Sequence, residues 1–238
     1  LVKLRRSPSG YDVAFASDDV APQLIESARV EKLDASKVPN PKNIAPRFRG
    51  LSWDAKNEHS VPYMWGFTGI AYNKNEVKTA PDSWAVLWDP KFVSKMTMLD
   101  DRRECFVAAM FANGDDPRKP TSESIARAKK KLLERRPLSY DSAPRQKLIV
   151  GDSWLSHSFN GDALQASEEK PEIGFVIPKE GATMWMDSML VPTGAPNRPL
   201  AHAFIDYLLR PGVSAEITNA VRFANPNELA QQHIKKEI

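Results

Sequence analysis

Apolar positions along this chain follow two periods that alternate. Runs in which nearly every residue, or every second one, is apolar predict strands, and apolar residues spaced three and four apart predict helices. Strands are predicted at residues 11–16, 61–73, 96–99, 173–177 and 181–192. Helices are predicted at residues 22–30, 84–88, about 101–112, 121–133, 163–167, 198–209 and 213–221. This alternation indicates an α/β fold with mainly parallel sheets, whose ligands bind at the carboxyl ends of strands.

The apolar run at residues 61–73 is long for a strand and reads Val-Pro-Tyr-Met-Trp-Gly-Phe-Thr-Gly-Ile-Ala-Tyr-Asn. It follows residues 37–60, which are rich in Pro and Asn and predict an irregular surface connection. Gly66 and Gly69 lie where the backbone can bend. We therefore expect this strand to cross between two lobes.

Length and composition describe an ordinary globular chain. Its 238 residues are 42% hydrophobic and 26% charged, enough for one large domain or for two lobes with separate cores. The net charge of +3 is small, and no recognisable nucleic-acid module accompanies the short basic clusters, so no nucleic-acid partner is expected. No run has the length of a membrane span. The chain begins at Leu1 without a signal peptide, and we expect any signal segment to lie outside it.

Cysteine and histidine restrict the chemistry further. Cys105 is the only cysteine, which excludes an internal disulfide, and its apolar neighbours predict a buried, inert thiol. The four histidines lie far apart without the spacing of metal ligands, so neither zinc catalysis nor a cofactor is expected.

Trp185 and Asp187 are the first candidates for a binding site. They lie two residues apart in a predicted strand, and period two places both side chains on one face. A ring face attracts positive charge and a carboxylate accepts hydrogen bonds from it, so the pair suits an organic cation. The alternative is that Trp185 belongs to the core and Asp187 is a solvated or capping acid.

Other acids have structural alternatives of the same kind. Asp101 and Glu104 lie three apart at a predicted helix start and can face one crevice, although the helix dipole favours acids there without any ligand. Asp162 and Asp19 each precede a predicted helix and can act as caps. A phenylalanine such as Phe159 is more often a core residue than a ligand contact. No spacing resembles a hydrolase motif.

A series of short motifs occurs in one order over nearly the whole chain. They are Tyr11-Asp-Val-Ala-Phe-Ala-Ser17, the run at residues 61–73, Asp82-Ser-Trp-Ala-Val-Leu-Trp-Asp-Pro-Lys91, Leu99-Asp-Asp-Arg-Arg-Glu-Cys-Phe106, Phe159-Asn-Gly-Asp-Ala-Leu-Gln-Ala166, Ile177-Pro-Lys-Glu-Gly181, Trp185-Met-Asp-Ser188 and Leu208-Leu-Arg-Pro211. Together they resemble the periplasmic spermidine- and putrescine-binding proteins of bacterial ABC importers.

The resemblance implies an α/β, two-lobed periplasmic-binding-protein fold of type II, with each lobe a sheet flanked by helices and hinge strands between them. Lobe 1 would comprise residues 1–69 and 187–238, and lobe 2 residues 70–186. The lobes would close on an extended, protonated amine held by acidic and aromatic side chains in the interlobe cleft. Carried over by position, the implied ligand contacts are Ser17, Asp19, Asp101, Glu104, Phe159, Asp162, Trp185, Asp187 and Phe223.

The chain departs from the family pattern in three ways. The family's first strand and aromatic ligand loop would lie before Leu1, and its last helices after Ile238, so we expect a fragment of a longer protein. Asp19 stands where some members have an aromatic residue, which adds an acid and leaves the choice of ligand open.

The resemblance thus implies a non-enzymatic, monomeric polyamine receptor for import that works with an inner-membrane ABC permease. The expected location is the periplasm, or a lipid anchor outside the cytoplasmic membrane. Three alternatives remain open: a solute-binding protein for another cationic or amino compound, an amine-conjugate hydrolase that uses Glu104 and Asp162, and a scaffold that binds no ligand.

Overall fold

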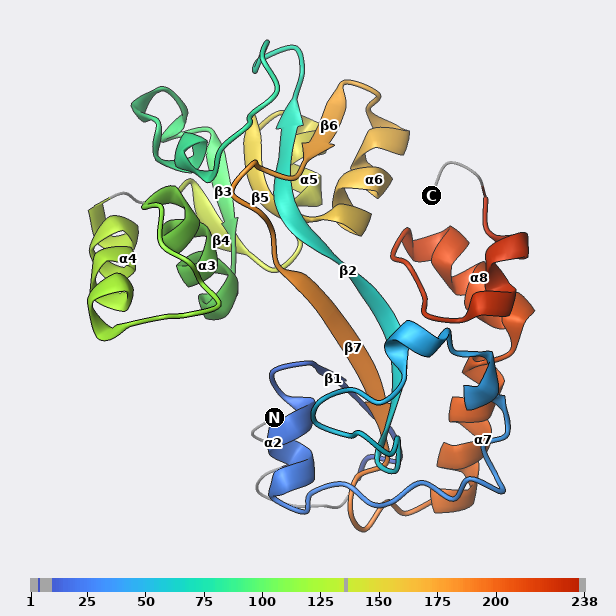
Figure 1. Ribbon diagram of the computed structural model, residues 1–238. Helices are drawn as coiled ribbons and strands as arrows, with labels where there is room; N and C mark the ends of the chain where they lie inside the picture. The colour runs from blue at the N-terminus through green and yellow to red at the C-terminus, as the bar shows by residue number, and fades with distance from the viewer. Residues whose placement is uncertain (1–3, 5–9, 135–136, 236–238) are drawn as a thin grey trace. The chain divides into compact units, whose positions relative to one another are not determined.

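The computed structural model describes residue 4, residues 10–134 and residues 137–235 (Figure 1). The chain forms two compact units: unit 1, residues 1–65 with 185–238, and unit 2, residues 66–184. Strands β2 (Ser60–Asn73) and β7 (Met184–Leu190) run without interruption through the two boundaries. The sequence places the boundaries at 69/70 and 186/187, within the same strands. Because no linker separates the units, no change in composition marks where one ends.

Unit 1 is built around the antiparallel pair of β1 (Ala14–Ser17) and β7. Its helices are α2 (Ala21–Glu26), α7 (Arg198–Leu208) and α8 (Pro211–Val221), with short 3-10 turns η1 (Asn40–Asn43), η2 (Pro46–Phe48) and η5 (Glu228–His233). Met186 and Met189 of β7 pack with Ile205 of α7 in one core cluster, and Leu190 packs with Leu24 of α2 in another.

Unit 2 contains a sheet in the order β6-β2-β5-β3-β4. Besides β2, its strands are β3 (Met96–Leu99), β4 (Ser139–Asp141), β5 (Leu155–Phe159) and β6 (Ile173–Val176). Its helices are α3 (Arg102–Ala112), α4 (Ser122–Glu134), α5 (Arg145–Val150) and α6 (Asn160–Glu169), with 3-10 turns η3 (Trp84–Trp88) and η4 (Pro90–Phe92).

The expectation of mainly parallel sheets is wrong, because the strands form mixed sheets. Strand β3 is parallel to β4 and β5, whereas β2 is antiparallel to β5 and β6, and β1 to β7. In unit 2 the strands joined through helices, β3 to β6, share one direction, as helical crossovers require. Strand β2 lies among them with the opposite direction. Alternation of strands with helices therefore predicts the directions of the connected strands but not that of β2.

Both faces of the unit 2 sheet are covered, which explains the continuous apolar run of β2. Ile70 and Tyr72 pack with Trp84 and Cys105 on the face that carries η3 and α3. Ala71 points to the other face and packs with Ala163 of α6. Figure 1 shows α3 and α4 on one side of this sheet and α5 and α6 on the other. A strand buried on both faces loses the polar alternation of a half-buried one.

Several elements differ from the prediction in length or existence. The sequence pattern predicts neither β5 nor β4, which is only three residues long and polar. Helix α2 ends at Glu26 rather than Val30, since Ala28 adopts a left-handed φ of 53°. Cys105 is buried as predicted, and burial raises the pKa of its thiol to about 12. Within the described residues, no helix combines the length and hydropathy that a membrane span needs.

Candidate functional site

Strand β7 presents Trp185 and Asp187 on the face opposite Met186. Met186 lies between them and is buried in the unit 1 core, whereas Trp185 and Asp187 are both partly exposed. The period of two predicted from the sequence therefore holds, and it directs an indole ring and a carboxylate to the same side of the strand.

Asp187 lies near two other acids of unit 1, Asp18 and Asp19. It lies opposite Ser17 in the β1–β7 register, at the end of β1 where Asp18 and Asp19 follow. Burial, and the negative charges of Asp18 and Asp19, raise the pKa of Asp187. Ionised Asp187 is therefore held in a place that disfavours its charge, and a cation bound there would relieve that cost.

Asp19 does not cap the helix that follows it. The N-cap residue of α2 is Val20, which makes no side-chain cap hydrogen bond. The Asp19 carboxylate instead accepts a hydrogen bond from the Ser17 hydroxyl, with 2.6 Å between Ser17 Oγ and Asp19 Oδ1. Ser17 and Asp19 thus form one polar group at the carboxyl end of β1, and the capping alternative for Asp19 is wrong.

Tyr63 joins this group from β2 and was missed by the sequence reasoning. Burial and the charge of Asp187 raise the pKa of its phenol. Its ring packs edge to face on Phe15, with 4.8 Å between ring centroids. Within the apolar run at residues 61–73 a tyrosine looks like core material. No signal in the sequence singles it out, because it stands between the apolar residues Pro62 and Met64, which are buried while Tyr63 is partly exposed.

Trp185 and Phe223 form an aromatic pair in unit 1. Their ring centroids lie 5.3 Å apart and the ring planes meet at 75°. Phe223 follows α8 directly after Arg222, whose left-handed φ of 62° ends the helix. The next residue, Ala224, is fixed to β2, because its carbonyl accepts a hydrogen bond from the Trp65 amide at 2.9 Å. The structure thus brings together two aromatic residues that lie far apart in the sequence.

In unit 2, Asp101 and Glu104 have different environments although they lie three residues apart. Asp101 is exposed and caps α3, since its carboxylate accepts a hydrogen bond from the Glu104 amide at 3.1 Å. This N-cap hydrogen bond is a structural role that differs from the dipole interaction considered from the sequence. Glu104 is only 5% exposed, and its burial raises the pKa of its carboxyl group. A buried helix-start acid is not explained by the helix dipole alone.

Two threonines that the sequence did not single out lie beside Glu104. The side chains of Thr68 and Thr183 lower the pKa of Glu104 and oppose the larger effect of burial. The Thr68 amide also donates to the Thr183 carbonyl at 3.0 Å, so the two threonines are fixed to each other. Thr68 is the register partner of Phe159 in the β2–β5 pair. Glu104 and Phe159 therefore share Thr68 as a neighbour.

Phe159 and Asp162 lie at the start of α6, where the N-cap residue is Phe159 and not Asp162. The Asn160 side chain accepts a hydrogen bond from the Phe67 amide at 2.9 Å and fixes this turn to β2. Burial raises the pKa of Asp162, and the positive charge of Arg145 partly opposes this effect. The N-cap alternative for Asp162 is therefore wrong. Asp162 lies inside the first turn of α6 and is partly buried.

The candidate residues thus fall into two groups, each within one unit. In unit 1, Ser17, Asp19, Trp185, Asp187 and Phe223 are linked to one another in pairs through register, hydrogen bonding, charge or ring contact. In unit 2, Glu104 and Phe159 have Thr68 as a common neighbour. Asp101 lies with Glu104 at the start of α3, and Asp162 lies with Phe159 at the start of α6. The pKa of one carboxyl group, Asp187, is raised in unit 1, and those of two, Glu104 and Asp162, are raised in unit 2. With the aromatic residues of each group, this is chemistry suited to an ammonium group.

The chain is similar to known proteins both in sequence and in structure. Residues 9–237 match the family model of bacterial extracellular solute-binding proteins. The chain is 34% identical over 241 residues to spermidine/putrescine-binding periplasmic protein 1 of Haemophilus influenzae, an alignment that covers 100% of this chain and 67% of that protein.

Two solved structures are similar over the whole chain. A Listeria monocytogenes protein, provisionally assigned to a spermidine/putrescine ABC transporter, has a TM-score of 0.94 at 30% identity, and 74% of its chain is covered. The Tp0655 (TpPotD) lipoprotein of Treponema pallidum has a TM-score of 0.88 at 30% identity, with 78% of its chain covered. Both alignments cover 100% of this chain.

Proposed function

Because this chain belongs to the bacterial extracellular solute-binding protein family, we propose that it captures a protonated polyamine, putrescine or spermidine, for an ABC importer. Its α/β fold is that of periplasmic binding proteins. The relative from Haemophilus influenzae is named for binding both amines, and this name supports the choice of ligand.

The observation that carries the proposal is the environment of Asp187. Asp18 and Asp19 raise the pKa of Asp187 together with burial, so unit 1 concentrates negative charge on a partly buried carboxylate. Like charges at one site are costly unless a cation joins them. An ammonium group supplies that cation and donates hydrogen bonds to the carboxylates. Trp185 and Phe223 offer ring faces for the methylene chain and for the charge.

Unit 2 offers a second place for an ammonium group. Glu104 is buried beside Thr68 and Thr183, and Asp162 lies partly buried beside Phe159. A polyamine has at least two ammonium groups separated by methylenes. We propose that carboxylates of both units contribute to its affinity, with Ser17, Asp19 and Asp101 as further contacts.

The proposal includes partners and location. The relatives are solute-binding proteins of transport systems, and by the proposal this chain acts without catalysis, as a monomer, and delivers its amine to an inner-membrane ABC permease. The relatives are named as a periplasmic protein and as a lipoprotein, which supports a location outside the cytoplasmic membrane.

A thermal-shift panel tests the class of ligand. The chain is melted with putrescine, spermidine, butylamine, 4-aminobutyrate, glucose or sulfate at equal ionic strength. We expect the two polyamines to raise the melting temperature most, because ligand that binds only the folded state stabilises it. Butylamine has one ammonium group and should act weakly. A larger shift with 4-aminobutyrate, glucose or sulfate would contradict the proposal and favour a receptor for another solute.

A further inference from the structure

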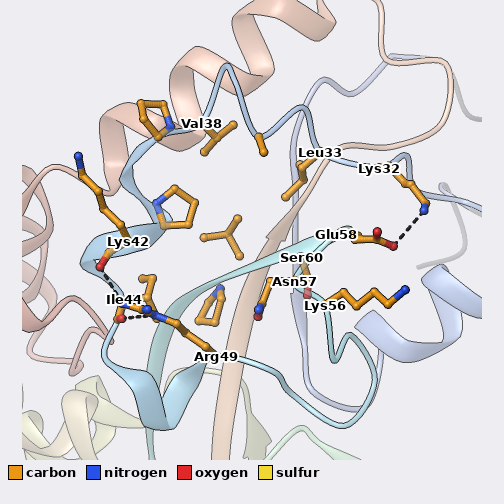
Figure 2. Close-up of a pocket in the computed structure, with 15 residues that line it drawn as sticks. Lys32, Leu33, Val38, Lys42, Ile44, Arg49, Lys56, Asn57, Glu58 and Ser60 are labelled. Atoms are coloured by element: carbon orange, nitrogen blue, oxygen red, sulfur yellow. Dashed lines mark hydrogen bonds and ion pairs between the residues drawn. The ribbon is translucent and has the colours of Figure 1, made fainter.

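Unit 1 contains a cavity of about 430 Å³ whose lining includes none of the candidate ligand contacts described above (Figure 2). Residues 32–62 form all of it, so it lies within one unit and within one continuous segment. Its volume falls in the range of small-molecule sites, about 300–1,000 Å³. The apolar part of the lining includes Leu33, Val38, Ile44 and Val61.

The hydrogen-bond acceptors of the cavity are already engaged. Glu58 forms an ion pair with Lys32, with 2.9 Å between Glu58 Oε2 and Lys32 Nζ. The Asn57 side-chain oxygen accepts a hydrogen bond from the Gly50 amide at 2.9 Å. A cation in this cavity would therefore compete with Lys32 for Glu58, the one acid of the lining.

Donors and positive charge, by contrast, are in excess. Four of the five ionisable lining residues are cations, and Glu58, the fifth, is paired with Lys32. Arg49 is held in place, since its Nε donates to the Ile44 carbonyl and its Nη2 to the Lys42 carbonyl, both at 2.7 Å. Within the described part of the chain, the ammonium groups of Lys42 and Lys56 take no ion pair. Figure 2 shows these two lysines at opposite sides of the lining.

We propose that this cavity binds a small organic anion with an apolar body, such as a medium-chain carboxylate. The carboxylate would take hydrogen bonds at one side of the lining, from the Lys42 and Arg49 side chains, which neighbour each other. Lys56 would add positive charge from the opposite side, and the hydrocarbon would cover Val38, Ile44 and Val61. Charge complementarity selects an anion, because the lining carries four cations and one acid, and that acid is already paired with Lys32. The apolar lining selects a ligand with a hydrocarbon part over an inorganic ion.

Three matched probes separate the two requirements. Octanoate has both the anion and the hydrocarbon, acetate lacks the hydrocarbon, and octylammonium reverses the charge. Titrations are followed by amide NMR shifts of the chain saturated with spermidine. We expect octanoate to bind and shift the amides of Lys56, Asn57 and Val61, with acetate and octylammonium at least tenfold weaker. Equal binding of octanoate and octylammonium, or no binding of octanoate, would overturn the proposal.

Variants locate the site. Lys42→Gln and Lys56→Gln should each weaken octanoate binding roughly 2- to 5-fold at low salt, as expected for partly exposed ion pairs. Lys78→Gln removes an exposed lysine of unit 2 and should have no effect. Identical octanoate binding in all three variants would contradict the site. Because spermidine is present throughout, competition between the two ligands would contradict a separate site, whereas failure of octanoate to bind would leave the polyamine proposal unaffected.

Discussion

Ser17 and Asp187 lie opposite each other in the antiparallel register of β1 and β7. This pairing places the carboxyl end of β1, with Asp18 and Asp19, beside a carboxylate that is 168 positions later in the chain than Asp19. Two segments with no sequence proximity thereby form one acidic group in unit 1. Its charge repulsion gives the candidate site properties that can be measured without knowing the ligand.

Replacement of Asp187 by Asn should stabilise the ligand-free protein. Burial and the neighbouring acids raise the pKa of Asp187 in the folded state, so its ionised form opposes folding at neutral pH. A gain of about 1 kcal/mol in the free energy of unfolding corresponds to roughly 2–4 °C in a chain of this size. The gain should shrink as pH falls through the raised pKa, because the native carboxyl group is then neutral too.

Calorimetric melting at pH 7 and pH 4 measures this effect. Asp116→Asn is the matched control, because hydrogen bonding to Arg118 lowers the pKa of Asp116 and its charge favours folding. That substitution should not raise the melting temperature. A lower melting temperature for Asp187→Asn at pH 7 would show that Asp187 is a structural acid.

Polyamine affinity should fall on mild acidification. The amines stay protonated at acid pH. Glu104, Asp162 and Asp187 have raised pKa values, so they become protonated at a higher pH than ordinary carboxyl groups do. Binding to the ionised forms must then release protons. Calorimetry in buffers of different ionisation enthalpy measures that release as the pH is lowered from 7 to 4. An affinity independent of pH down to pH 4 would argue against these carboxylates as ligand contacts.

The aromatic pair should contribute to affinity through its rings and not only through its apolar area. Cation–π contacts contribute about 0.5–2 kcal/mol, so Trp185→Ala and Phe223→Leu should each weaken spermidine binding roughly 2- to 30-fold. Leucine keeps most of the apolar surface of Phe223 but has no ring face. Equilibrium dialysis with labelled spermidine gives the ratio. An unchanged affinity in Phe223→Leu would remove Phe223 from the site.

Gly69 of β2 should tolerate no larger residue. A Cβ at this position would lie 2.5 Å from the Phe175 ring and 2.5 Å from the Val176 carbonyl oxygen, and the carbonyl belongs to a paired strand that cannot easily move. Gly69→Ala should therefore lower the free energy of unfolding by about 1–3 kcal/mol in a urea titration. Gly212→Ala is the control, since a Cβ there meets nothing within 4 Å. Equal stability of the two variants would contradict the close approach at Gly69.

The sequence predicts most elements of this fold and the face of β7. Period two correctly separates Met186 from Trp185 and Asp187, and the amphipathic pattern correctly predicts α7 and α8. The solved relatives confirm the α/β periplasmic-binding-protein fold. The direction of β2 could not be predicted, because an apolar strand buried on both faces has the same composition in either direction.

The environment of the candidate residues lies beyond the sequence for a similar reason. Thr68 and Thr183 lie beside Glu104 through pairing between segments more than a hundred residues apart, and nothing in their local sequence marks them. Tyr63 resembles its apolar neighbours and differs only in the side of β2 that it occupies. Asp101 and Glu104 look alike at a helix start, and only packing makes one exposed and the other buried.

Isothermal titration calorimetry with putrescine and spermidine, on the native chain and on Asp187→Asn and Asp162→Asn, tests the central claim most directly. The account predicts micromolar or tighter binding of at least one amine to the native chain. Loss of a charge-assisted hydrogen bond, about 1.5–3 kcal/mol, should weaken it at least tenfold in each variant. The absence of heat with either amine, together with binding of a sugar or an anion, would contradict the claim. So would full affinity in both variants.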